Sequence, residues 1–160
     1  MIEIRPATIA DVPLLWTMIR ELADFEHELE CVSITEEVLA RDGFEENPRF
    51  RAIIAEWDRH PAGYALFSPY FSTWDGRGMF LEDLFVRKDF RRHGVGRALL
   101  AAVARLALEE HCYGIHWQVL DWNTNAVNWY KALGADFRDS WRPVLLTGDS
   151  LERLAGSRKV

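Results

Sequence analysis

The chain has 160 residues, enough for one domain built around one hydrophobic core. Hydrophobic residues make up 49% of it and charged residues 28%, a balance that excludes intrinsic disorder. The formal net charge of −6 argues against nucleic acid as the main partner, because phosphate contacts need a basic surface. No apolar run approaches the roughly 20 residues that cross a bilayer, and residues 1–6 do not resemble a signal peptide, so we expect no membrane association.

The two cysteines, Cys31 and Cys112, are too few for a disulfide scaffold or a Cys-based zinc site, and the histidines show no metal-ligand spacing. We therefore expect a reduced, cytoplasmic protein without a bound metal. Residues 21–46 hold ten acidic residues and one basic residue. Such a stretch would suit a cationic ligand, and a solvated acidic surface would explain it equally well.

Hydrophobic periodicity and capping residues predict elements along the whole chain. Thr8, three residues before Asp11, is typical of a helix start, and Thr35 and Asn123 can cap two further helices. Pro69 predicts a bend or bulge in its strand. The expected strands are at 2–5, 51–57, 63–74, 79–86, 114–120, 136–138 and 142–146, and the expected helices are at 8–23, 35–43, 94–110, 123–133 and close to the C-terminus.

The resulting order, β-α-α-β-β-β-α-β-α-β-β, predicts an α/β fold. The three consecutive strands should pair antiparallel, whereas strands that lead into helices should include a parallel pair. We expect one domain over residues 1–160, with a mixed, mostly antiparallel central sheet flanked by helices.

The sequence Arg91-Arg92-His93-Gly94-Val95-Gly96-Arg97 lies between an apolar strand and a long helix. Glycines there let successive N–H groups point into one concavity at a helix N-terminus, where a pyrophosphate fits, and the arginines add charge. The segment is neither a P-loop, which needs Gly-Lys-Ser/Thr, nor a dinucleotide fingerprint. The alternative is that the glycines merely begin a helix beside a solvated basic loop.

This loop, following Leu84-Phe85-Val86, resembles the acyl-CoA loop of the GCN5-related N-acetyltransferase (GNAT) superfamily, and further segments resemble its diamine acetyltransferase branch, which acts on spermidine, spermine or thialysine. The resemblance covers nearly the whole chain in order. The segments that carry it are Ile4-Arg5-Pro6-Ala7-Thr8, Arg20-Glu21-Leu22-Ala23, Phe25-Glu26, Asp42-Gly43-Phe44, Leu81-Glu82-Asp83, Trp122-Asn123 and Asn128-Trp129-Tyr130-Lys131.

Glu82 and Asp83 stand among apolar residues in the strand predicted at 79–86 and should point to opposite faces unless a bulge intervenes. A carboxylate in so apolar a strand needs a partner or a solvated cleft, and an edge strand with one wet face would supply the latter. An alkylammonium, with a pKa of about 10, must lose a proton before it can attack, and a carboxylate is the expected base. The resemblance gives that role to Glu82 and implies that Asp83 helps to hold the amine.

The resemblance also implies that Tyr130 donates a hydrogen bond or proton to the departing thiolate, although a core tyrosine is the alternative from the residues alone. It implies that backbone groups of Leu84, Phe85 and Val86 pair with the pantetheine amides, as an added strand would. The remaining residues expected to contact acetyl-CoA are Arg91, Arg92, His93, Gly94, Val95, Gly96, Arg97, Asn123, Thr124, Asn125 and Ala126.

The residues expected around the acceptor are Phe25, Glu26, Asp83, His116, Trp117, Gln118 and Asp139. Phe25 departs from the tyrosine that the family often has there, which affects the choice of amine rather than the chemistry. His116 could equally be a hydrogen-bonded strand histidine. The resemblance implies an acetyl-CoA-dependent N-acetyltransferase that acts on a small cationic amine, and a homodimer, because the family commonly forms dimers. We expect direct attack in a ternary complex, because no cysteine is placed to act as an acyl carrier. A non-catalytic CoA-binding module and an enzyme for another amine, such as a protein N-terminus or an aminoglycoside, remain the alternatives.

Overall fold

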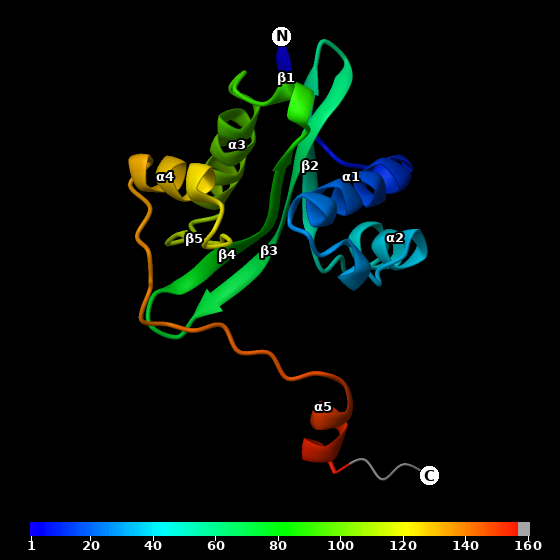
Figure 1. Cartoon of the computed structure of the whole chain (residues 1–160), viewed down its shortest axis with the longest axis vertical. Helices are drawn as coiled ribbons and strands as arrows, with labels where there is room; N and C mark the ends of the chain where they lie inside the picture. Colours follow the sequence, from blue (N-terminus) through cyan, green and yellow to red (C-terminus); the bar gives the residue numbers. More distant parts are fainter. Residues whose placement is uncertain (157–160) are drawn as a thin grey trace. The chain divides into compact units, whose positions relative to one another are not determined.

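A five-stranded sheet is the centre of the first of two units into which the chain divides, Met1–Leu120, and the second unit begins at Asp121. Figure 1 shows the computed structural model, which describes residues 1–156. The first four strands pair antiparallel in chain order, and β5 lies parallel to β4. The mixed, mostly antiparallel sheet predicted from the sequence is therefore confirmed. The strands are β1 (Ile2–Pro6), β2 (Arg51–Trp57), β3 (His60–Ser72), β4 (Gly76–Val86) and β5 (Ile115–His116).

Helices cover both faces of this sheet (Figure 1). The helices of the first unit are α1 (Val12–Phe25), α2 (Glu36–Phe44) and α3 (Val95–Glu109). Alternate residues of β2 divide between the faces: Ile53 packs in a buried cluster with α3, and Ile54 packs in another with α1. An apolar stripe on each helix meets one face of the sheet, as the helical spacing of apolar residues predicts.

A β-bulge at Glu82 reverses which residues of β4 face α3. Leu81 is opposite Phe67 and Asp83 is opposite Leu66, so Glu82 is an extra residue without an opposite partner. Before the bulge, Leu81 packs in the α3 cluster, and after it Phe85 packs in the α1 cluster. Asp83 therefore lies on the α1 face. This is the exception that the alternation rule allows, and it makes the predicted acids neighbours of α1.

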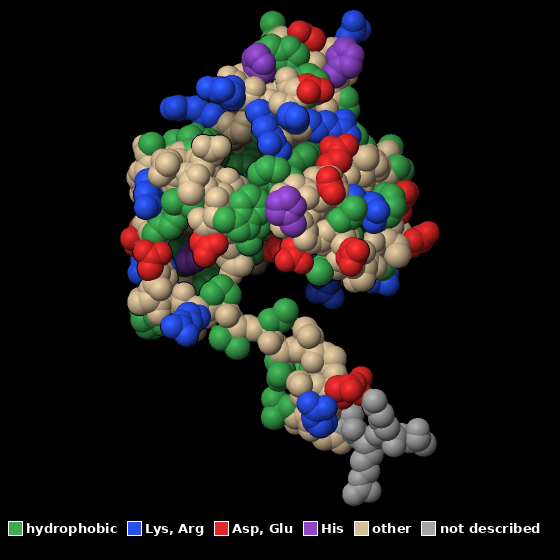
Figure 2. All heavy atoms as spheres, in the orientation of Figure 1, with side chains coloured by type: hydrophobic (Ala, Val, Ile, Leu, Met, Phe, Trp, Pro, Cys, Tyr) green, Lys and Arg blue, Asp and Glu red, His purple; other side chains and the backbone are tan. Residues whose placement is uncertain are grey.

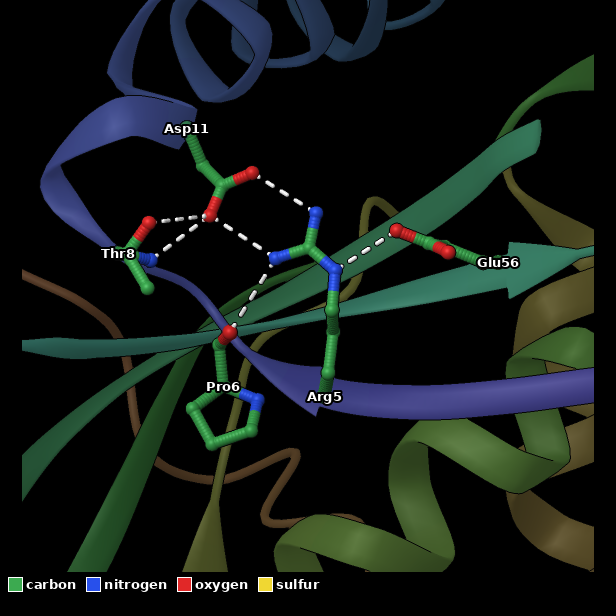
Figure 3. A network of polar contacts seen from close by, with 5 residues as sticks. All are labelled: Arg5, Pro6, Thr8, Asp11 and Glu56. Carbon is green, nitrogen blue, oxygen red and sulfur yellow. Dashed lines mark hydrogen bonds and ion pairs between the residues drawn. The ribbon is translucent and has the colours of Figure 1, made fainter. Parts of the chain in front are cut away.

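The turn that leads into α1 is fixed to the sheet by Arg5 (Figure 3). Its guanidinium donates to both oxygens of Asp11, at 2.8 and 2.9 Å, and to Glu56 Oε1 at 2.7 Å. Asp11 also accepts hydrogen bonds from the backbone and side chain of Thr8, which completes the predicted capping box. The Arg5 guanidinium, followed by these Thr8 bonds, lowers the pKa of Asp11 to about 2, whereas its burial opposes the shift.

The C-terminal end of α1 is held near the end of β4 by a second bidentate pair. Arg87 donates from Nε and Nη2 to the two oxygens of Glu21, each at 2.8 Å, and from Nη1 to Pro61 O at 3.2 Å. Arg87 therefore serves the scaffold. Because α1 ends four residues after Glu21, this pair brings Phe25 and Glu26 toward β4.

The second unit has two helices, α4 (Thr124–Ala132) and α5 (Gly148–Leu154). Asn123 caps α4 by accepting from Ala126 N at 3.3 Å, as predicted. The predicted strands at 136–138 and 142–146 are wrong: neither segment forms a strand. A strand requires a neighbouring backbone, and between residues 121 and 156 there is no other strand to supply one.

The strand predicted at 114–120 is shorter than expected, because only Ile115 and His116 pair with β4. The next pairs would fall at the Glu82 bulge, which interrupts the ladder. Pro69 lies within the regular part of β3, so the predicted bend at Pro69 is wrong. The register shift of β3 falls between Leu66 and Phe67 instead.

Candidate active site

The segment between β4 and α3 presents several backbone N–H groups to which no described residue offers an acceptor. Gly94 precedes α3 with φ of 85°, a left-handed conformation that favours glycine. Its carbonyl accepts from Ala98 N at 2.9 Å, the first amide bond at this end of the helix. Within residues 1–156, the amides from Arg92 to Arg97 have no hydrogen-bond acceptor. The helix end therefore offers several donors and its partial positive charge to an anion, as the motif predicts.

Basic side chains surround these amides. Figure 2 shows a band of Lys and Arg side chains where β4 leads into α3. Arg92 and Arg97 are exposed, and neither has an ion-pair partner in the described part of the chain. Free amides beside exposed arginines suit an anion such as a diphosphate, and the binding of CoA at this loop stays a prediction.

Arg91 occupies a different position from the other two arginines. Its Nε donates to Val86 O at 2.9 Å, and its guanidinium lies 4.6 Å from the centre of the Phe25 ring and 6.0 Å from that of Phe85. Part of this guanidinium is therefore already engaged in contacts within the protein. Arg91 joins the loop to the last residue of α1, Phe25, and its remaining N–H groups stay available to an anion.

Two other predicted loop residues make contacts within the first unit, His93 from an exposed position and Val95 from a buried one. The His93 ring lies 5.1 Å from the Trp57 ring. The Val95 side chain is buried in the α3 cluster, so its contact with a ligand would come from its backbone amide alone. Gly96 is half-buried in the first turn of α3.

The outer edge of β4 is open beyond the bulge. β5 pairs only with Met79 and Phe80, so on that side the predicted pantetheine residues Leu84, Phe85 and Val86 have no strand partner among the described residues. An extended ligand can therefore add to this edge. One of its carbonyls, Val86 O, already accepts from Arg91, which reduces the groups available.

Three carboxylates come together on the α1 face of the sheet: Glu26 directly after α1, and Glu82 and Asp83 at the bulge. Asp83 Oδ2 accepts a 2.8 Å hydrogen bond from the hydroxyl of Tyr64, whose side chain is completely buried in β3. Burial raises the pKa of Asp83 to about 6; Tyr64 opposes the rise, and the charges of Glu82 and Glu26 add to it. Burial also raises the pKa of Glu26.

None of these three carboxylates forms an ion pair with a basic side chain of residues 1–156. Like charges held together in a partly buried place cost free energy unless a cation relieves them. The predicted residues Glu26, Glu82 and Asp83 are thus brought together in a cluster suited to a positively charged ligand. Phe25 adds an aromatic ring beside it.

The other residues of the first unit that were predicted to contact the acceptor amine either make contacts within the protein or are exposed. His116 hydrogen-bonds through Nε2 with the Tyr113 hydroxyl, and its ring lies 4.5 Å from that of Tyr70. Trp117 packs against the α3 cluster, and Gln118 is exposed. His116 therefore has the contacts of the structural alternative, a hydrogen-bonded strand histidine.

The remaining predicted residues belong to the second unit, and their roles toward the loop stay predictions. Asn123 caps α4, with Thr124, Asn125 and Ala126 in the first turn. Tyr130 is buried, its ring centre is 5.0 Å from that of Trp129, and burial raises the pKa of its phenol. Asp139 is exposed outside any helix or strand.

Tyr64 is the residue that the sequence analysis missed. It stands 19 residues before Asp83, and no motif marks it. Its position opposite Phe85 places its hydroxyl near Asp83 only because the bulge returns Asp83 to the same face. Finding Tyr64 therefore required the register of two strands.

In residues 1–156, no group of three or more His, Cys, Asp or Glu side chains is arranged to hold a metal ion. No helix there has both the length and the apolar character needed to cross a bilayer.

The comparisons with known proteins agree with this geometry. The acetyltransferase (GNAT) family matches residues 16–135. The thialysine N-epsilon-acetyltransferase of Mus musculus is 41% identical, over 96% of this chain and 97% of that protein. The protein of that name from Caenorhabditis elegans is 40% identical over 82% and 81%.

Solved structures show the same fold. An integron cassette protein from the mobile metagenome of V. cholerae superimposes with a TM-score of 0.80 and 24% identity, over 98% of each chain. An aminoglycoside N-acetyltransferase in complex with CoA superimposes with a TM-score of 0.72 and 22% identity, over 93% and 95%. Family and relatives favour an enzyme over the non-catalytic alternative: the chain belongs to the acetyltransferase (GNAT) family and is an acetyl-transferring enzyme.

Proposed function

We propose that this protein transfers the acetyl group of acetyl-CoA to a primary amine of a small cationic acceptor, of the thialysine, diamine or polyamine type. The observation that carries the proposal is the cluster of Glu26, Glu82 and Asp83, which lacks a cationic partner of its own among residues 1–156. An alkylammonium supplies such a cation. The 41% identity to a thialysine N-epsilon-acetyltransferase supports the same class of acceptor.

The cofactor is proposed to bind at the β4–α3 loop. The free amides from Arg92 to Arg97 would hold its diphosphate, with Arg92 and Arg97 supplying charge. The open edge at Leu84–Val86 would pair with the pantetheine arm. When bound there, acetyl-CoA supplies an activated thioester.

In the proposed reaction, Glu82 removes one proton from the acceptor ammonium, directly or through water. The freed nitrogen lone pair forms a bond to the acetyl carbon, and the carbon–sulfur bond breaks. The nitrogen then gives up its second proton as the amide forms, which replaces the proton that the departing sulfur takes up. Glu82 suits the role because it is exposed on the bulge, whereas Asp83 is already bonded to Tyr64. Tyr130 is proposed to donate a proton or hydrogen bond to the departing sulfur, since burial keeps its phenol protonated.

Direct attack in a ternary complex is favoured over an acyl-cysteine route. Glu28 accepts a hydrogen bond from the Cys31 thiol at 3.1 Å and raises its pKa, which disfavours the reactive thiolate. Cys112 packs against the α3 cluster. Neither cysteine therefore suits an acyl carrier.

We further propose a homodimer in a reducing, cytoplasmic setting. Both cysteines are free, and Phe71 and Trp74 at the β3–β4 hairpin expose 71% and 85% of their surface. Exposed aromatic residues of this kind are common in the centres of interfaces. Sedimentation of the full chain would give one species of twice the monomer mass, and a monomer at all concentrations would contradict the proposal.

The test is an amine panel with the full chain and acetyl-CoA. Thialysine, ornithine and spermidine should gain one acetyl group by mass, with stoichiometric release of free thiol. An aminoglycoside and a peptide with a free N-terminus serve as comparison acceptors, and faster acetylation of either would overturn the proposed acceptor class. Glu82→Gln should abolish transfer to all of the small amines while CoA affinity stays within twofold.

A further inference from the structure

We propose that Tyr64 is a positioning residue for acceptor recognition: its buried hydroxyl holds one oxygen of Asp83 so that the other oxygen faces the acceptor ammonium. The inference rests on the proposed function, because it assigns Asp83 to the acceptor. It adds a residue from β3, a strand to which the sequence analysis assigned no role in the reaction.

Packing fixes the position of the hydrogen-bond donor, the Tyr64 hydroxyl. Tyr64 is completely buried, and its ring centre lies 6.2 Å from that of Phe85 in the cluster that packs on α1. Such a ring has no room to turn, so its hydroxyl has one place to point. That hydroxyl donates to Asp83 Oδ2 at 2.8 Å.

The other carboxylate oxygen of Asp83, Oδ1, is the atom that remains for a ligand. Asp83 Oδ1 has no hydrogen-bond partner within residues 1–156, and no side-chain nitrogen or oxygen there is both buried and unsatisfied. Oδ1 is therefore accessible to a ligand although most of the residue is not. A carboxylate held at Oδ2 has a fixed orientation, and the lone pairs of Oδ1 remain available to an N–H donor.

Neighbouring charged groups affect how readily Asp83 ionises. Glu82 from its own strand and Glu26 after α1 both disfavour its ionised form, whereas the hydrogen bond from Tyr64 favours it. The Arg91 guanidinium lies against the rings of Phe25 and Phe85, and among residues 1–156 no basic side chain forms an ion pair with Asp83. Without Tyr64, Asp83 would be more protonated near neutral pH and free to rotate, and both changes weaken its hold on an ammonium.

The test compares Tyr64→Phe with Tyr70→Phe, which removes a hydroxyl from the same strand but away from Asp83. Tyr64→Phe should raise the acceptor KM about fivefold at pH 7 and move the acid limb of kcat/KM upward by about one pH unit. CoA affinity should stay within twofold. Tyr70→Phe should change neither quantity.

Two further measurements separate positioning from a general structural effect. In an Asp83→Ala background, Tyr64→Phe should have no additional effect on the acceptor KM, whereas additive losses would overturn the inference. Carboxyl-carbon NMR of Asp83 should show its midpoint move upward in Tyr64→Phe. An unchanged midpoint would also overturn it.

The NMR titration needs no acetyl transfer, so the two proposals can fail separately. If no amine on the panel is acetylated, the proposed function fails even when the Asp83 midpoint moves. If amines are acetylated but the KM and the midpoint ignore Tyr64→Phe, only the role of Tyr64 fails.

Discussion

The β4–α3 loop and the acidic cluster of Glu26, Glu82 and Asp83 offer different kinds of group to a ligand. The loop offers main-chain amides from consecutive residues, and its geometry depends on the left-handed conformation of Gly94. The acidic cluster offers side chains from separate parts of the chain: Glu26 after α1, and Glu82 and Asp83 in β4, with Asp83 held by Tyr64 from β3. The first kind of site tolerates most side-chain changes, whereas the second depends on each hydroxyl and carboxylate.

The largest effect is expected from Tyr130→Phe, which tests whether the chemistry needs a side chain outside both regions. Turnover should fall about 100-fold because the departing sulfur loses its proton donor. Stopped-flow or steady-state thiol release gives kcat, and calorimetry gives CoA affinity. Equal losses of turnover and CoA affinity would show that the tyrosine is structural instead.

Gly94→Ala tests the dependence of the loop on its backbone. A side chain at φ of 85° strains the turn, and CoA affinity should fall about tenfold. Gly76→Ala is the matched control, because Gly76 has φ of 90° in the β3–β4 turn with open space around it. Both variants should lose similar stability, by about 1 kcal/mol, and only Gly94→Ala should weaken CoA binding.

Substitutions of Phe25 test the contact between the β4–α3 loop and the end of α1, because the Arg91 guanidinium lies over the Phe25 ring. Phe25→Leu removes a cation–π contact and should weaken CoA binding about threefold. Phe25→Tyr keeps the ring and should leave CoA affinity unchanged while the acceptor KM changes. If leucine and tyrosine behave alike in CoA binding, the ring does not brace Arg91.

The smallest effect on activity is expected from Asp11→Asn, which lies in neither region. The acceptor KM should not change, whereas the free energy of unfolding at pH 7 should fall by about 1–2 kcal/mol. Because Arg5 lowers the pKa of Asp11 to about 2, its stabilising contribution is complete above about pH 4 and is lost as the pH falls through 2. Urea unfolding from pH 7 to pH 2 measures this, and a difference independent of pH would contradict it.

The order of elements was predictable up to α4 because each has a local signal. The Thr8–Asp11 capping box, the Thr35 and Asn123 caps and the apolar stripes of the helices all appear as predicted. The failures are non-local. The segments at 136–138 and 142–146 have strand-like sequences, but a strand is made by its partner, which the sequence does not specify.

The same distinction applies to the candidate site. The loop was predictable because Gly94 and its arginines are consecutive, whereas the hydrogen bond between Tyr64 and Asp83 depends on strand register and a one-residue bulge. The commitment of Arg91 to Val86 O and Phe25 was equally invisible, since it joins residues 66 positions apart in the case of Phe25. Sequence identified the kinds of residue present, and packing decided which of them a ligand can reach.

Because Glu82 is an extra residue, the two halves of β4 turn their odd-numbered side chains to opposite faces of the sheet. Up to Leu81 its odd-numbered side chains pack under α3, and from Asp83 onward they lie on the α1 face of the sheet. Excision of Glu82 would therefore do more than delete one carboxylate: it would turn the following residues over, driving a charged group into the hydrophobic interior and Leu84 out toward the amine. A single inserted residue thus affects both the proposed chemistry and the packing of β4, so a deletion at this position would change the two together.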